Sequence, residues 1–127
     1  VVAIHTQGLN DRVEFQLVGG QLLYALITHA STARLGLQPG AQLCALVKAP
    51  WVRLRAADAE LEPGDNCLSG RLCELQMDSE DGEAVVELDD GAQLVAVLSA
   101  IQVERLELQV GQQVQLLIDA EQIILCA

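Results

Sequence analysis

The chain has 127 residues, of which 51% are hydrophobic and only 2% aromatic, so its core must be built from Val, Leu, Ile and Ala. No apolar stretch approaches the roughly 20 residues that span a bilayer, and no basic segment precedes an apolar one at the start, so we expect a cytoplasmic protein without membrane contact. The net charge of −11 argues against a chain that itself grips nucleic acid, and four cysteines without CxxC spacing do not support a zinc site.

The first predicted element is a β-hairpin. Val13, Phe15 and Leu17 alternate with polar residues, which is the pattern of a half-buried strand, and a Gly-Gly pair at 19–20 follows as a turn. The apolar run of the second strand ends at Ile27. The hairpin therefore ends just before a group of polar residues.

A short helical turn is expected next. Ser31 can cap this turn, and Gly36 can end it. Thr28, Ser31 and Arg34 recur at intervals of three, which places two hydroxyl groups and a guanidinium around the start of the turn. Free backbone N–H groups at such a turn also favour an anion.

The first copy is predicted to end in a strand over residues 42–47, which Pro39 and Gly40 introduce, and in a further apolar stretch at 51–54. Lys48 lies between these two segments and adds a positive charge.

The sequence contains an internal duplication. At an offset of 71 residues, positions 25–54 match positions 96–125 without a gap, and ten of the 30 pairs are identical. The second copy repeats the order of elements, with an opening strand at 68–75 and a hairpin around Asp90 and Gly91. The first copy starts at Val1 and lacks that opening strand.

These patterns predict an all-β fold of two tandem OB-like five-stranded barrels, each with one short helix. The expected boundaries are a first module over residues 1–55, a linker over 56–66 and a second module over 67–127. The linker is acidic and contains a Pro-Gly pair at 63–64.

Charge is divided unequally along the chain. Residues 1–57 carry five cations and two acids, a net charge of +3, whereas residues 58–127 carry two cations and sixteen acids, a net charge of −14. An anion should be attracted to the first half of the sequence and repelled by the second.

No catalytic arrangement of Ser, His and acid stands at a recognisable spacing, so we expect a protein that is not an enzyme. Four polar residues of the first copy provide the donors that a tetrahedral dianion requires: Thr28, Ser31, Arg34 and Lys48. The second copy has Ser99, Gln102, Arg105 and Asp119 at the matching positions. The exchange of lysine for aspartate reverses the charge and predicts that the second copy has lost the site.

Structural roles also fit these residues. Thr28 and Ser31 can cap a helix, Arg34 can be a solvated surface charge, and Lys48 can lie along apolar surface. We expect His29 to be an exposed turn residue, and Trp51 to anchor the core or an interface.

The segment from Ala25 to Thr28, with Ser31, the Arg-Leu-Gly-Leu run at 34–37 and the Lys-Ala-Pro-Trp-Val run at 48–52, resembles the molybdate-binding Mop module, a TOBE-like domain. The resemblance covers essentially the whole chain. Such modules occur in tandem in molbindins, which store molybdate, and in the C-terminal half of molybdate-responsive transcriptional regulators of the ModE family, to which the resemblance is strongest.

The resemblance implies that molybdate, with tungstate as an analogue, binds at a dimer interface and that the site includes Thr28, Ser31, Arg34, Lys48 and Ala49. The family's module opens with a Ser-Ala-Arg-Asn segment that also contributes to the site, and that segment would precede Val1.

We therefore expect the effector domain of a molybdate-responsive regulator, which forms a homodimer and reaches DNA only through an N-terminal domain absent from this chain. Two other contexts stay open: a cytoplasmic storage molbindin, and the accessory domain of a molybdate ABC transporter ATPase. The loss of the lysine at Asp119 disfavours storage, because a storage protein gains by keeping both copies competent.

Overall fold

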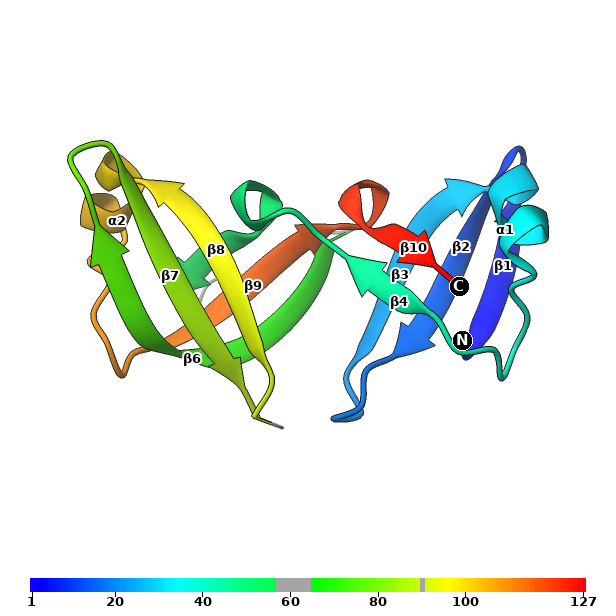
Figure 1. Ribbon diagram of the computed structural model, residues 1–127, viewed down its shortest axis with the longest axis horizontal. Coiled ribbons are helices and arrows are strands. Elements are labelled where there is room, and N and C mark those ends of the chain that lie inside the picture. The colour runs from blue at the N-terminus through cyan, green and yellow to red at the C-terminus, as the bar shows by residue number, and fades with distance from the viewer. Residues whose placement is uncertain (57–64, 90) are drawn as a thin grey trace. The chain divides into compact units, whose positions relative to one another are not determined.

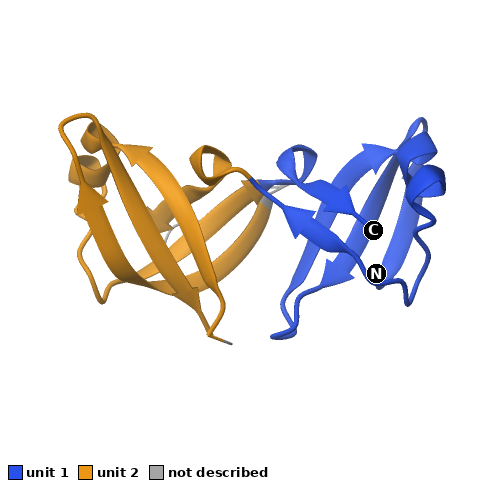
Figure 2. Cartoon of the chain, viewed as in Figure 1, with its two compact units in different colours: residues 1–47, 119–127 blue, residues 48–118 orange. Residues whose placement is uncertain are grey.

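A computed structural model describes residues 1–56, 65–89 and 91–127 (Figure 1). Residues 57–64 of the expected linker, and Asp90 of the expected second hairpin, lie outside the described residues. The chain divides into two compact units (Figure 2): unit 1 comprises Val1–Val47 and Asp119–Ala127, and unit 2 comprises Lys48–Ile118. No helix in the described ranges is both long and apolar enough to cross a membrane.

Unit 1 contains a three-stranded antiparallel sheet, a two-stranded ribbon, an α-helix and a short 3-10 turn. The sheet has the order β1-β2-β3, with β1 at Ala3–Gln7, β2 at Asn10–Gln16 and β3 at Leu22–Thr28. The helix α1 covers His29–Leu35. The ribbon joins β4 (Cys44–Leu46) to β10 (Ile124–Cys126), and the 3-10 turn η2 covers Ala120–Gln122.

Unit 2 contains a five-stranded sheet, an α-helix and a 3-10 turn. The sheet has the order β5-β9-β6-β7-β8, with bounds Arg53–Ala56, Gln113–Asp119, Asp65–Met77, Asp81–Leu88 and Gln93–Ser99 in that order. The helix α2 covers Ala100–Arg105, and the 3-10 turn η1 covers Ala49–Trp51.

The last strand of each sequence copy pairs with a strand of the other copy, and it therefore belongs to the compact unit that the other copy forms. β5 ends the first copy, yet Arg53 pairs with Leu117 of β9; β10 ends the second copy, yet Ile124 pairs with Leu46 of β4. The expected boundaries at 1–55 and 67–127 follow the sequence repeat, whereas the compact units follow this strand pairing. A duplicated sequence offers each last strand two similar partners, so an exchange loses no main-chain hydrogen bonds.

The two units share one architecture despite the exchange. Each has five described strands and one short α-helix, which confirms the expected all-β, OB-like fold. Matching positions of the two copies form the same main-chain hydrogen bonds. Val1 pairs with Ala41 and Gly40 at 2.7 and 2.9 Å, and its counterpart Leu72 pairs with Gln112 and Gly111 at 2.9 and 2.7 Å.

The cores are built from matching aliphatic positions. Buried residues of unit 1 and their counterparts 71 positions later are Val13 and Ala84, Phe15 and Val86, Ala25 and Ala96, and Leu37 and Leu108. The alternating apolar pattern of the predicted hairpin therefore corresponds to the inward faces of β2 and β3.

Candidate functional site

Two hydroxyl groups meet where β3 passes into α1. Thr28 is the N-cap of α1, and its Oγ1 accepts a hydrogen bond from the Ser31 backbone N–H at 3.1 Å. The two side-chain oxygens are 2.8 Å apart and exposed. The helix thus begins at His29, and Thr28 rather than the expected Ser31 caps it. We call Thr28 and Ser31 the hydroxyl pair.

The hydroxyl pair can offer two donors to an anion. Because Thr28 Oγ1 already accepts from a backbone N–H, its own proton is available, and the Ser31 proton can turn either toward Thr28 or toward solvent. An oxyanion that replaces the mutual hydrogen bond can therefore accept from both hydroxyls.

Arg34 lies in the last turn of the same helix. Its side chain is exposed and forms no ion pair with any residue in the described ranges. The helix ends at Gly36, whose φ of 66° is in the left-handed region that favours glycine, as the sequence predicts. The structure therefore brings three of the expected site residues onto one short helix and its cap.

A buried carboxylate lies beneath this helix. Asp11 of β2 has a side chain that is 1% exposed, and its two oxygens are 3.2 and 3.0 Å from His29 Nδ1. Thr6 is the cross-strand partner of Asp11, and Thr32 Oγ1, which donates to the Thr28 carbonyl oxygen at 3.4 Å, is on the side of the helix that contributes to stabilising the carboxylate. We call Asp11, Thr6, His29 and Thr32 the buried acid cluster.

The buried acid cluster favours the charged form of Asp11. The hydrogen bond from Thr32, followed in importance by those from Thr6 and His29, lowers the pKa of Asp11 below its ordinary value of 3.8, and burial opposes this effect only in part. His29 is the first residue of α1 rather than a turn residue, and its ring remains largely exposed, as expected.

Lys48 and Ala49, the other two expected site residues, belong to unit 2. Lys48 is exposed at the start of η1, and its Nζ lies 4.9 Å from the centre of the Trp51 ring, within range of a cation–π interaction. The five expected residues therefore form two groups, one on each unit.

Asp119, the counterpart of Lys48, is the last residue of β9 and the first residue of the second segment of unit 1. Its side chain accepts a hydrogen bond from the Glu121 N–H at 2.9 Å, and the turn η2 that follows it packs against β3. The strand exchange thus reverses the expected placement of charge. The acid shares a unit with the hydroxyl pair, and the lysine shares a unit with Gln102 and Arg105.

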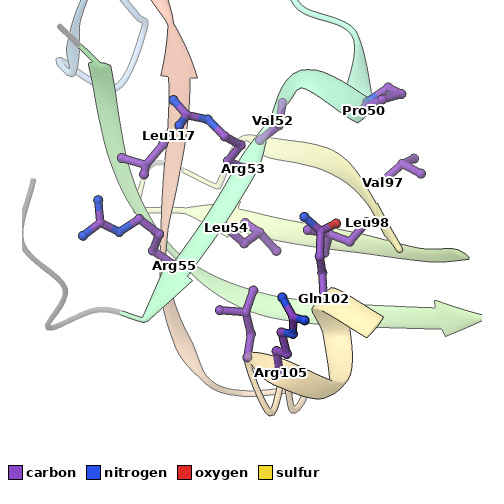
Figure 3. Close-up of a pocket in the computed structure, with 11 residues that line it drawn as sticks. Pro50, Val52, Arg53, Leu54, Arg55, Val97, Leu98, Gln102, Arg105 and Leu117 are labelled. Atoms are coloured by element: carbon purple, nitrogen blue, oxygen red, sulfur yellow. The ribbon is translucent and has the colours of Figure 1, made fainter. Parts of the chain in front are cut away.

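Unit 2 also has a cavity of about 370 Å³ (Figure 3). Gln102 and Arg105 of α2 line it, together with Arg53 and Arg55 of β5 and Pro50 of η1; the remaining lining residues are all aliphatic. Gln102 is engaged in a capping box, because its Oε1 accepts from the Ser99 N–H at 3.0 Å. This cavity combines cations with apolar walls, whereas the hydroxyl pair is an open polar surface.

Sequence reasoning missed Asp11. The residue has the same parity along β2 as Val13 and Phe15, which face the core, so strand alternation alone indicates an inward-facing carboxylate. A buried acid requires donors, and the pattern did not identify them because they lie on β1 and α1.

Comparisons with known proteins agree on one family. The model of the TOBE domain matches residues 1–54 and 62–125. The transcriptional regulator ModE of Yersinia pestis is 32% identical over 120 residues, which are 94% of this chain and 46% of that protein. The molybdenum-pterin-binding protein MopA of Rhodobacter capsulatus is 30% identical over 129 residues, 98% of this chain and 48% of that protein.

The DNA-binding transcriptional dual regulator ModE of Escherichia coli K12 is 33% identical over 92% of this chain and 44% of its own length, so the chain spans about half the length of these relatives. Among solved structures, the cytoplasmic molybdate-binding protein ModG with molybdate bound superposes with a TM-score of 0.95. It is 28% identical to this chain, and the match covers 100% of this chain and 91% of that one.

Proposed function

Because the chain belongs to the TOBE domain family, we propose that it binds molybdate, with tungstate as an analogue, through Thr28, Ser31, Arg34, Lys48 and Ala49. The observation that carries this proposal is the exposed hydroxyl pair at 2.8 Å, placed with Arg34 on one helix and its cap. Charge-assisted hydrogen bonds from hydroxyl and guanidinium donors are the strong kind that a dianion needs to replace its water shell. The match to ModG, which holds molybdate in the same fold, supports the choice of anion.

The proposed role is that of an effector domain in a cytoplasmic, molybdate-responsive transcriptional regulator. Similarity to two ModE proteins over nearly the whole chain supports this role. The proposed role is one of binding rather than catalysis. In such a regulator two copies associate, and DNA contact belongs to a different part of the protein. The anion must then bind one arrangement of the dimer more tightly than another, because equal affinity shifts no population.

Storage is the second candidate, since the whole length of the chain also matches the molybdate-binding protein ModG. The two roles differ in the number of anions bound per chain. We expect one molybdate per chain for an effector domain, because Gln102 replaces Ser31 in the second copy. Calorimetry that gives two or more anions per chain would favour storage instead.

The site is tested by isothermal titration with molybdate, tungstate and sulfate. Ser31→Ala and Arg34→Ala each remove a donor to a charged ligand, worth about 1.5–3 kcal/mol, so the Kd for molybdate should rise by about ten- to a hundredfold. The matched controls are Gln102→Ala and Arg105→Ala, at the same positions of the second copy, and these should leave the Kd unchanged. Equal affinity in all four variants would place the anion elsewhere.

A further inference from the structure

The buried acid cluster has a feature that the fold alone does not require. A carboxylate that is 1% exposed would be strongly unfavourable without hydrogen bonds, and Asp11 obtains them from two other elements, β1 and α1. Two of its partners, His29 and Thr32, lie on either side of Ser31 in the first turn of the helix. The carboxylate therefore holds the turn that carries the hydroxyl pair.

Unit 2 shows that a helix at this place can be attached without any such cluster. The four matching positions are apolar or glycine: Met77, Gly82, Ala100 and Val103 stand for Thr6, Asp11, His29 and Thr32. A Cβ on Gly82 would lie 2.7 Å from Met77 Sδ and 2.8 Å from Val103 Cγ2, so these side chains fill the space that the carboxylate occupies in unit 1.

The main-chain attachment of the two helices is nevertheless the same. His29 N–H donates to Leu9 O at 2.8 Å, and Ala100 N–H donates to Glu80 O at 2.8 Å. Helix attachment therefore does not explain why unit 1 maintains a buried charge. The hydroxyl pair, however, is present only in the unit that has this charge.

We propose that Asp11 is a positioning residue for oxyanion binding: by holding His29 and Thr32, it fixes the first turn of α1 so that the two hydroxyls face the anion together. This role rests on the proposed function. Donors that are held in place before the ligand arrives bind more tightly than donors that must be ordered on binding, and Thr32, which also stabilises the charged Asp11, donates from its Oγ1 to the Thr28 carbonyl oxygen at 3.4 Å.

Unit 2 supplies the test variant. Thr6→Met, Asp11→Gly, His29→Ala and Thr32→Val together replace the buried acid cluster with the apolar set that already packs in unit 2. We expect the variant to fold, as judged by circular dichroism and a cooperative thermal transition, and its Kd for molybdate to rise about tenfold. Asp78→Asn, which alters an acid of unit 2 that is likewise held by hydrogen bonds, is the control and should leave the Kd unchanged.

The single variant Asp11→Asn provides a second measurement. Asn keeps one acceptor oxygen for the helix but loses the charge and the second acceptor. A positioning role therefore predicts that the affinity of Asp11→Asn for molybdate lies between those of the parent and the quadruple variant. If the charge of Asp11 merely repelled the anion, Asp11→Asn would bind molybdate more tightly than the parent, and the positioning role would be wrong.

The outcomes separate the two proposals. If the parent chain gives no heat of binding with molybdate, the proposal of molybdate binding is overturned, and the role of Asp11 is overturned with it. If the parent binds molybdate and either the folded quadruple variant or Asp11→Asn binds it with the same Kd, molybdate binding stands and only the positioning role is overturned. Weaker binding by both variants, with Asp78→Asn unchanged, supports both proposals.

Discussion

Ser31 and Gln102 occupy the same helical position in the two units, yet they leave different groups available to a ligand. Gln102 is long enough to return to the Ser99 N–H, and this capping box engages its carbonyl oxygen. Ser31 is too short for that contact, so its hydroxyl remains beside Thr28 at the surface. A difference of one side chain thus separates a closed helix cap from a pair of exposed donors.

Lys48 and Trp51 provide a spectroscopic test at the residue scale. The Lys48 ammonium lies 4.9 Å from the indole ring, and a lysine that turns toward a dianion must leave that position. We expect the fluorescence of Trp51, the sole tryptophan of the chain, to change on addition of molybdate. Lys48→Ala should abolish this change and raise the Kd by about ten- to a hundredfold. Constant emission during a titration that calorimetry shows to be complete would remove Lys48 from the site.

The pH dependence of stability provides a test of Asp11. Its pKa in the folded chain lies below the ordinary value of 3.8, so the charged cluster contributes its full stability above that value. The contribution is lost as the pH falls below 3.8 and through the lower pKa of the folded state. We expect the unfolding free energy of the parent to exceed that of Asp11→Asn near neutral pH, with the difference shrinking in acid. A difference that stays constant from pH 6 to pH 2 would contradict this assignment.

At the scale of elements, the exchange of β5 and β10 decides which charges accompany which helix. β5 follows η1 and β10 follows η2 along the chain. Each 3-10 turn therefore belongs to the compact unit of the other sequence copy, together with the strand that follows it. As a result η1 packs against β8 in unit 2, and η2 packs against β3 in unit 1. The acid at position 119 therefore belongs to the unit of the hydroxyl pair, where its negative charge would oppose the anion binding that we propose.

This placement predicts the effect of Asp119→Lys. The substitution replaces a carboxylate by a cation in the unit that contains Thr28 and Arg34, so the affinity for molybdate should increase severalfold. The turn should tolerate the change, because Lys48 begins η1 without any side-chain cap. Glu83→Lys, which makes the same change in net charge on unit 2, is the control and should have a smaller effect in a titration at 0.15 M salt. An equal effect of both variants would mean that net charge alone is responsible.

At the scale of the whole molecule, the ribbon of unit 1 differs from its counterpart in unit 2. β4 pairs only with β10 among the described strands, whereas β9 pairs with both β5 and β6. Leu46 and Ile124 are cross-strand partners and are 56% and 46% exposed, while Leu117, the counterpart of Leu46, is 2% exposed. An exposed strand edge with adjacent apolar side chains is a surface that proteins usually cover.

We expect a second copy of the chain to cover this ribbon. Light scattering should give the mass of a dimer or a larger assembly at micromolar concentration, and Leu46→Lys should shift the distribution toward monomer. Val110→Lys, which alters an exposed apolar residue of unit 2 outside the ribbon, is the control. A parent chain that is monomeric under these conditions contradicts the expectation.

The sequence by itself determined the features that depend on local pattern. Strand alternation, the 71-residue repeat and the spacing of Thr28, Ser31 and Arg34 sufficed to predict two OB-like units and the hydroxyl pair, because side-chain direction in a strand or a helical turn follows from the backbone period. The resemblance of the Lys-Ala-Pro-Trp run added the family and the candidate anion.

Only the tertiary structure decided where the last strands pair and what surrounds Asp11. The two copies offer similar partners to β5 and β10, so no local signal distinguishes pairing within a copy from exchange between copies, and with that choice the positions of Lys48 and Asp119 also changed. The donors of Asp11 come from β1 and α1, which are separated from it along the chain, and hydrogen bonds between distant elements form only once the chain has folded.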